Sequence, residues 1–419
     1  MLELWFDFSC PYAYLASRLA SRFGTAIDWR PMLLGGVFRG IGAGDGPMAT
    51  LSPAKREHNF HDMHRWAAHF GIPFQMPEAH PMRTVRALRT LLALPHSRWP
   101  SAIEAIYAAY WQRAEDVTSD AVIARALAGA GVSADDIASA QARAEDPAIK
   151  DELRVRTDEA IALGIFGAPA WILRRDSGPL LIWGQDRIGF LEAALAGWDP
   201  DGGPPPGGPR PFLEAPPAKP GATLDVYFDI SSPFAYLALT QLPALTCATG
   251  VTPRLVPILL GALFKQIDQV NVPLLAMPEA KQRYIGRDMH RWANWWGEPF
   301  VFPAKFPQRT VDAQRLCILA AERGFDPGVK LATALARAMW AERKDLEDRS
   351  VLQSVLEASG LPGGWIDRTG EPELKQALFD NTAAAIANKV FGVPTFIVNG
   401  TQLLWGQDRL ELVAAELAR

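Results

Sequence analysis

The residues best suited to chemistry in this chain are a cysteine and a serine at equivalent positions of two similar segments. Cys10 precedes Pro11 and Ser232 precedes Pro233, and each pair follows a short apolar and aromatic run that ends in Asp and Ser. Such a run predicts a buried strand, and proline is common in the first turn of a helix. Each side chain should therefore stand at a helix N-terminus, where free amides and the helix dipole favour negative charge.

Ser232 has no histidine nearby in sequence to act as its base, which makes it a poor nucleophile. Its hydroxyl is better suited to donate a hydrogen bond to a bound thiolate, which would lower the pKa of that thiol. The simpler alternative is that Ser232 caps the helix, a common role for serine at this position.

Cys10 should itself be acidified, because a helix N-terminus stabilises a thiolate. The segment Cys10-Pro11-Tyr12-Ala13 looks like a redox CxxC motif whose second cysteine is replaced by Ala13. Without a resolving partner, a mixed disulfide with glutathione becomes possible and two-thiol exchange is disfavoured. The alternative is a buried, inert cysteine. Cys247 and Cys317 lie in apolar helical contexts and are expected in the core.

The elements that must position these residues occur twice, which indicates a duplicated domain and not a solenoid unit. Residues 199–222 are rich in proline and glycine and predict a semi-extended linker between domains 1–198 and 223–419. The two copies share an ending as well. It reads Phe166-Gly167-Ala168-Pro169 and Trp183-Gly184-Gln185-Asp186-Arg187 in the first copy, and Phe391-Gly392-Val393-Pro394 and Trp405-Gly406-Gln407-Asp408-Arg409 in the second.

Each copy predicts the order β-α-β, a large helical block, then β-β-α, which is an α/β thioredoxin-type fold interrupted by helices. The pair Asn399-Gly400 is a strong hairpin signal between the last two strands of the second copy. In the first copy we expect strands at residues 2–8, 27–34, 170–173 and 180–183, a first helix at 12–23 and a helical block at 55–162. In the second copy we expect strands at residues 224–230, 252–260, 395–398 and 403–405 and a helical block at 281–387.

The bulk properties exclude some functions. A net charge of −4 provides no basic field for nucleic acid. No apolar run approaches the roughly 18 residues of a membrane span, and we expect no signal peptide. The three cysteines are far apart and have no zinc spacing, so no metal site is expected. Free thiols favour a reducing compartment, which predicts a cytoplasmic protein.

The three motifs, in this order and spacing, resemble the DsbA-like superfamily, specifically 2-hydroxychromene-2-carboxylate isomerases and kappa-class glutathione transferases. The likeness covers residues 223–419 and, with departures, residues 1–198. It rests on residues 229–236, 391–396 and 405–409.

This resemblance implies that glutathione is the cofactor and that the serine activates its thiol. It implies that Pro169 and Pro394 are cis and face the cysteine and the serine. A cis bond leaves the backbone of Ala168 and Val393 able to pair with an extended peptide such as glutathione. The alternative for each proline is an ordinary loop position.

Further glutathione contacts are implied at the last helix of each copy. Asp186 and Asp408 would receive the γ-glutamyl ammonium, beside Gln185 and Gln407; the alternative for each aspartate is a helix cap, and both roles are compatible.

Asn271 and Lys281 match the family's remaining contacts, and the first copy has Asp45 and Lys55 at these positions. Lysine could pair with a carboxylate, although a solvated helix face is its commonest position.

The implied reaction is glutathione-dependent isomerisation of a small aromatic carboxylate from an aromatic-degradation pathway, with the two domains paired as an internal pseudo-dimer. Tyr236 and Phe264 would line the substrate side. Two alternatives stay open: a thiol oxidoreductase or transferase that uses Cys10 or Ser232, and a non-catalytic glutathione-binding module.

Overall fold

The computed structural model describes residues 1–44, 46, 51–212 and 215–419. The chain divides into two compact units, described separately below. The first unit comprises Met1–Leu51, Phe60–Ala196 and Met277–Arg283; the second comprises Ser52–Asn59, Gly197–Ala276 and Tyr284–Arg419.

Each unit contains one four-stranded sheet, in which an edge strand pairs parallel with its neighbour and the other two pairings are antiparallel. The first sheet has the order β2-β1-β3-β4 and the second β6-β5-β7-β8, so the strand order is the same in both. The strands are β1 (Leu2–Phe6), β2 (Ile27–Pro31), β3 (Ala170–Leu173) and β4 (Leu180–Trp183), then β5 (Leu224–Phe228), β6 (Arg254–Pro257), β7 (Thr395–Val398) and β8 (Gln402–Trp405).

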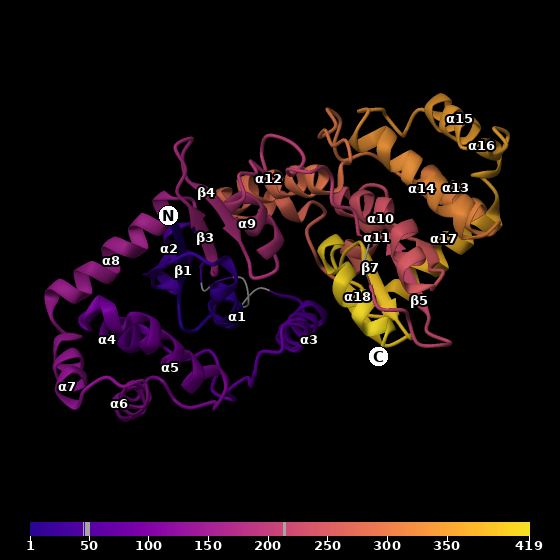
Figure 1. Ribbon diagram of the computed structural model, residues 1–419. Helices are drawn as coiled ribbons and strands as arrows, with labels where there is room; N and C mark the ends of the chain where they lie inside the picture. The colour runs from indigo at the N-terminus through magenta and orange to yellow at the C-terminus, as the bar shows by residue number, and fades with distance from the viewer. Residues whose placement is uncertain (45, 47–50, 213–214) are drawn as a thin grey trace. The chain divides into compact units, whose positions relative to one another are not determined.

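Helices make up most of each unit (Figure 1). In the first unit α4 to α7 gather apart from the sheet, and α8 runs from this group back toward it. The first repeat contains α1 (Pro11–Leu19), α2 (Leu34–Gly40), α3 (Pro53–His69), α4 (Val85–Ala93), α5 (Trp99–Trp111), α6 (Asp120–Gly129), α7 (Ala134–Arg143), α8 (Pro147–Ala162) and α9 (Ile188–Leu195).

The second repeat has the same sequence of elements. Its helices are α10 (Pro233–Thr249), α11 (Leu260–Gln266), α12 (Glu279–Trp296), α13 (Val311–Ala321), α14 (Phe325–Trp340), α15 (Arg349–Ala358), α16 (Trp365–Arg368), α17 (Pro372–Ala387) and α18 (Leu410–Leu417).

The predicted α/β fold with helical insertions is confirmed, and the differences lie at element ends. The first strand of each repeat stops two residues early, because the chain turns there to place Cys10 and Ser232 before α1 and α10. The hairpin at Asn399-Gly400 is confirmed: β7 and β8 pair antiparallel on either side of it, and both turn residues have positive φ, as a tight hairpin turn requires.

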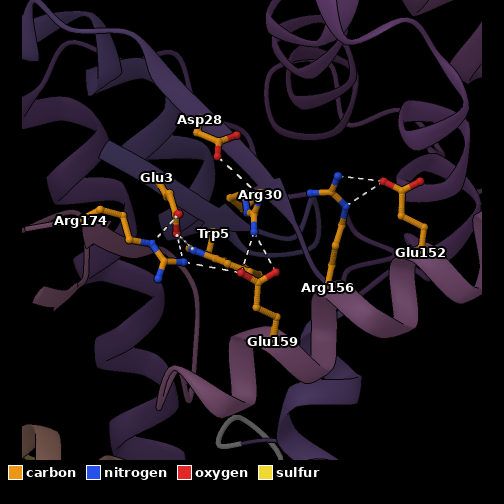
Figure 2. A network of polar contacts seen from close by, with 8 residues as sticks. All are labelled: Glu3, Trp5, Asp28, Arg30, Glu152, Arg156, Glu159 and Arg174. Atoms are coloured by element: carbon orange, nitrogen blue, oxygen red, sulfur yellow. Dashed lines mark hydrogen bonds and ion pairs between the residues drawn. The ribbon is translucent and has the colours of Figure 1, made fainter. Parts of the chain in front are cut away.

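A polar network ties the first sheet to α8 (Figure 2). Glu3 points from β1 and is 2% exposed, and it accepts hydrogen bonds from Arg174 Nε at 2.8 Å and Trp5 Nε1 at 2.9 Å. Arg30 of β2 reaches both carboxylate oxygens of Glu159 on α8, at 2.7 and 2.8 Å. The buried Glu3 carboxylate needs such partners, and the pair of Arg30 with Glu159 joins β2 to α8.

The proline- and glycine-rich segment forms no helix or strand in its described residues, 199–212 and 215–222. It is nevertheless attached along the second unit. Asp201 pairs with the buried Arg291 at 2.8 Å, Arg210 N donates to Trp295 O at 2.6 Å, and Ala218 N donates to Thr249 O at 3.0 Å. The segment is therefore part of the second unit's surface and not a free tether.

Candidate functional site

Cys10 and Ser232 each occupy the N-cap of a helix, α1 and α10. Both have extended backbone angles, φ −96° and ψ 114° for Cys10 and φ −99° and ψ 122° for Ser232, and proline begins each helix. This geometry follows from the local sequence, because proline fixes the first helical φ and has no amide to leave unpaired. The first amides of both helices therefore point toward these two side chains.

Each N-cap side chain lies against a proline corner that is distant in sequence. The bonds Ala168–Pro169 and Val393–Pro394 are cis. Cys10 Sγ donates to Ala168 O at 3.2 Å, and Ser232 Oγ donates to Val393 O at 3.1 Å, and both contacts are buried. The structure thus brings together the residues that the sequence placed about 160 positions apart.

Ser232 caps its helix, which is one of the two roles that the sequence left open, and its proton is bound by a backbone carbonyl. Its Oγ accepts a hydrogen bond from Ala235 N at 3.3 Å, which is an N-cap contact, while its proton goes to Val393 O. A hydroxyl can do both, since it has one donor and two lone pairs. The cap fixes the oxygen in place and leaves the direction of the proton free to change.

Cys10 does not have the acidified thiol that we expected. Burial raises the pKa of Cys10 to about 12, and the nearby Asp7 raises it further, whereas the amides of Ala13 and Tyr12 lower it by less. The expectation was wrong because it weighed the helix start but could not include desolvation, which disfavours the charged form. In the free protein Cys10 is a neutral thiol donor.

Two buried aspartates organise the turns before these N-caps, and sequence reasoning did not single them out. Asp229 Oδ2 accepts Leu260 N, the first amide of α11, at 2.8 Å, and its Oδ1 accepts Ser231 N and Thr310 Oγ1 at 2.9 and 2.8 Å. Asp7 makes the corresponding contacts in the first unit. Burial raises the pKa of both carboxyls. The occurrence of an aspartate at this position in both repeats was the sequence signal that could have identified Asp7 and Asp229.

In each repeat, the Trp-Gly-Gln-Asp-Arg motif is hydrogen-bonded to the cis proline. Gly406 N donates to Pro394 O at 3.0 Å, and Gly184 N donates to Pro169 O at the same distance. Gly406 has a φ of +114°, and a Cβ atom there would lie 2.5 Å from Asp408 Oδ1. Only glycine combines this backbone angle with so close an aspartate.

Asp186 and Asp408 already have positive partners. Each pairs at 3.0 Å with the arginine that follows it, Arg187 and Arg409, and all four side chains are largely buried. An ammonium bound there would share the carboxylate with this arginine. The aspartates are therefore part of a preformed charge pair near the corner.

Several polar groups at these corners lack a partner among the described residues. The amide groups of Ala168 and Val393 donate no hydrogen bond there. Gln185 is 3% exposed and its Nε2 is unpaired, and the buried Trp405 Nε1 is unpaired too. Unpaired buried donors are uncommon in folded proteins. These donors could bind a ligand that carries carbonyl or carboxylate oxygens.

The two lysines are placed differently from the expectation. Lys281 belongs to the first unit, where its Nζ lies 5.7 Å from the Trp183 ring centroid. Lys55 belongs to the second unit, 4.7 Å from the Trp405 ring. The described contacts thus join Lys281 to the last motif of the first repeat, and Lys55 to that of the second.

Lys281 has an unusual environment for a lysine. It forms no ion pair with any described residue, and burial lowers its pKa. A desolvated ammonium over an indole face is a suitable site for a carboxylate ligand.

The remaining predicted contacts divide between the site and the core. The Asn271 side-chain oxygen lies 3.3 Å from where a Cβ would stand on Gly261, at the start of α11, whose first amide binds Asp229. Its counterpart Asp45 lies outside the described residues. Tyr236 and Phe264 are buried, and the Tyr236 hydroxyl donates to Pro299 O at 2.8 Å, so Tyr236 serves packing.

The other cysteines also correct an expectation. Cys317 is buried as predicted, whereas Cys247 is exposed. Cys247 lies on the outward face of α10, which helical periodicity did not separate from the buried face in so apolar a helix.

A shallow cavity of about 720 Å³ lies elsewhere in the second unit. It is lined by the end of the linker, the start of β5, and residues 249–252 and 254. Ser232 follows the opposite end of β5, so this cavity is separate from the candidate site.

Two tandem α/β units, each with a helix N-terminus against a cis-proline corner, define a thioredoxin-type protein. A family model described as DSBA-like thioredoxin domain matches residues 1–196 and 223–418. The chain therefore belongs to the DSBA-like thioredoxin family, and contains its domain twice.

Known relatives match about half of this chain, which is the length of one domain. A 2-hydroxychromene-2-carboxylate isomerase of Pseudomonas putida is 33% identical over 205 residues, covering 47% of this chain and 94% of the relative. Glutathione S-transferase kappa 1 of Caenorhabditis elegans is 26% identical over 203 residues, covering 46% and 88%. A solved 2-hydroxychromene-2-carboxylate isomerase structure is 28% identical, covers 46% of this chain and 93% of its own, and has a TM-score of 0.42.

Among the described residues, no helix has both the length and the apolar character needed to cross a membrane.

Proposed function

We propose that this chain is a glutathione-dependent isomerase of the 2-hydroxychromene-2-carboxylate type, acting on an unsaturated aromatic carboxylate in the cytoplasm. The observation that carries the proposal is the position of the Ser232 hydroxyl, fixed between a helix amide and the Val393 carbonyl. The names of the relatives support both the cofactor and the reaction class.

Ser232 is the group that would stabilise the sulfur. Its oxygen is held by Ala235 N, so its proton can turn from Val393 O toward a thiolate without loss of the cap. Glutathione would supply a sulfur nucleophile that adds reversibly to the conjugated ring system and permits bond rotation. The α10 N-terminus would add a favourable field for the negative charge.

The peptide part of glutathione would lie along the proline corner. The free amide of Val393 would donate to a glutathione carbonyl, as in an added strand. Trp405 Nε1 and the Asp408 carboxylate, beside Gln407, would bind the ends of the peptide. In the first unit Ala168, Pro169, Gln185, Asp186 and Lys281 would have these roles.

We propose that the second unit is the more active one. A thiol is a weaker hydrogen-bond donor than a hydroxyl, and burial keeps the Cys10 thiol neutral. The same burial makes a redox role for Cys10 unfavourable, because the thiolate is the reactive form.

We also propose that the two domains pair as an internal pseudo-dimer. A small-angle scattering profile that shows two separated bodies would contradict this pairing.

The proposal is tested with three alanine variants of the full chain. Ser232→Ala should reduce glutathione-dependent conversion of 2-hydroxychromene-2-carboxylate by about 10²- to 10³-fold, the usual effect of losing one donor to a developing anion. Ser231→Ala is the matched control and should retain activity, and Cys10→Ala should retain most of it. Wild-type turnover by Ser232→Ala would refute the assignment. If calorimetry detects glutathione binding but no turnover is measured, the chain is a non-catalytic glutathione-binding module.

A further inference from the structure

The first unit contains a histidine–tyrosine pair that the second unit lacks. His80 Nδ1 lies 3.0 Å from the Tyr110 hydroxyl, and that hydroxyl also accepts Met82 N at 2.9 Å. The Tyr110 side chain is buried and that of His80 is partly buried, and the His80 ring lies 5.1 Å from that of Trp111. Sequence reasoning did not single out either residue.

This pair stands next to the turn that carries Cys10. Trp111 Nε1 donates to Phe8 O at 2.9 Å, two residues before the cysteine, and Tyr110 stacks on Trp111 with ring centroids 4.3 Å apart. Four residues after His80, Thr84 donates to Asp7, which organises the same turn. The His80 imidazole is thus one aromatic ring away from the candidate site.

The second repeat gives the comparison. Trp340 Nε1 donates to Ile230 O at 2.8 Å, which makes Trp340 the counterpart of Trp111 and Met339 the counterpart of Tyr110. His80–Pro81 corresponds to Phe306–Pro307, and both bonds are cis. The Phe306 ring lies 5.7 Å from that of Trp340, so phenylalanine occupies the place of the histidine.

The positions of the protons on this pair follow from its burial. Burial raises the pKa of Tyr110 to about 12 and lowers the pKa of His80, so at neutral pH the tyrosine keeps its proton and the imidazole is neutral. The Tyr110 O–H then donates to Nδ1, which fixes the tautomer with a proton on Nε2. His80 Nε2 makes no hydrogen bond to any described residue.

We propose that His80, oriented by Tyr110, donates a hydrogen bond from Nε2 to an acidic oxygen of an aromatic ligand in the Cys10 unit. The ligand class, a small aromatic carboxylate, rests on the proposed function. The second unit presents Phe306 and Met339 instead and binds the aromatic part by apolar contact alone. The two units therefore select different ligands, and His80 is a specificity-determining residue of the first.

A purely structural role for His80 is disfavoured by the second unit. There the equivalent loop is held by Gln308, whose Nε2 donates to Lys305 O at 3.1 Å and whose Oε1 accepts Leu346 N at 2.9 Å. In the first unit Tyr110 replaces Gln308 by accepting Met82 N directly. The second arrangement holds the loop without a histidine, and the loop there accepts phenylalanine before the same cis proline.

The test uses the full chain with ¹⁵N-labelled histidine, reduced glutathione and trans-cinnamate as the probe. The His80 signals are identified by their loss in His80→Phe, which introduces the residue of the second unit and should keep the fold, with a lower melting temperature because the Tyr110 hydroxyl loses its acceptor. Cinnamate should shift the Nε2 signal of His80 saturably, and its uncharged methyl ester should not. His80→Phe should bind cinnamate about tenfold more weakly at one site, the usual effect of losing a hydrogen bond to a charged group.

Tyr110→Phe is the second variant, and it should weaken cinnamate binding and release the fixed tautomer of His80. An unmoved Nε2 signal, or unchanged cinnamate binding by His80→Phe, would overturn the proposal. Because these signals require no turnover, this outcome is distinguishable from an active Ser232→Ala variant, which would overturn the proposed function instead.

Discussion

Ser232 Oγ lies 3.1 Å from Val393 O, and Cys10 Sγ lies 3.2 Å from Ala168 O in the other unit. The two repeats therefore keep one geometry and differ in the atom that occupies it. The oxygen is a strong donor that also caps its helix, whereas the sulfur makes no cap contact and is a neutral, buried thiol. Differences between the units in how they treat the sulfur of a ligand should follow from this exchange.

Replacing the sulfur by oxygen should make the first unit resemble the second. In Cys10→Ser the hydroxyl can accept Ala13 N and donate to Ala168 O, as Ser232 does. The new N-cap should stabilise the protein against unfolding by about 0.5–1 kcal/mol, and glutathione-dependent turnover should rise by up to about twofold. Denaturant melts and initial rates measure both effects. A rise in activity in the double variant Cys10→Ser/Ser232→Ala, compared with Ser232→Ala, would locate the gain in the first unit.

The thiols should differ strongly in reactivity. With a pKa of about 12, Cys10 should resist iodoacetamide at pH 8, while the exposed Cys247 reacts first. Because only the thiolate attacks, the Cys10 rate should rise about tenfold per pH unit between pH 8 and 10. Peptide mass spectrometry gives the order of labelling. Rapid modification of Cys10 at pH 8 would show a far lower pKa.

The buried Asp229 should make stability depend on pH in a defined direction. Its pKa is raised from 3.8, so the folded state holds this proton more tightly than the unfolded state. Its contribution to stability is therefore fully present below pH 3.8 and lost as the pH rises through the folded pKa. The unfolding free energy of the wild type minus that of Asp229→Asn should fall over this interval. A difference that rises with pH would mean a lowered pKa.

The glycine of the last motif should be sensitive to a single methyl group. Gly406→Ala combines a φ of +114° with a clash against Asp408 Oδ1 and should destabilise the protein by about 1–3 kcal/mol and weaken glutathione binding. Gly400→Ala is the matched control, with a φ of +70° and no atom within 4 Å of the new Cβ. It should cost about 1 kcal/mol and leave binding unchanged. If the two variants have equal effects, the close contact with Asp408 does not explain the sensitivity of Gly406.

The sequence by itself determined the features that depend on neighbouring residues. Apolar runs, prolines at helix starts and the Asn399-Gly400 turn are local signals, so they predicted the strands, the N-cap positions of Cys10 and Ser232 and the hairpin. The repeat of these signals predicted two α/β domains of one family, and the family match agrees.

Only the tertiary structure decided how much water each group retains and which distant residues surround it. Burial raised the pKa of Cys10 against the effect of its helix, and the exposed face of α10 carried Cys247 to the surface. Lys281 and Lys55 were grouped with Trp183 and Trp405, and His80 was brought to Tyr110. Desolvation and long-range contact are sums over the whole packed unit, and no window of sequence contains them.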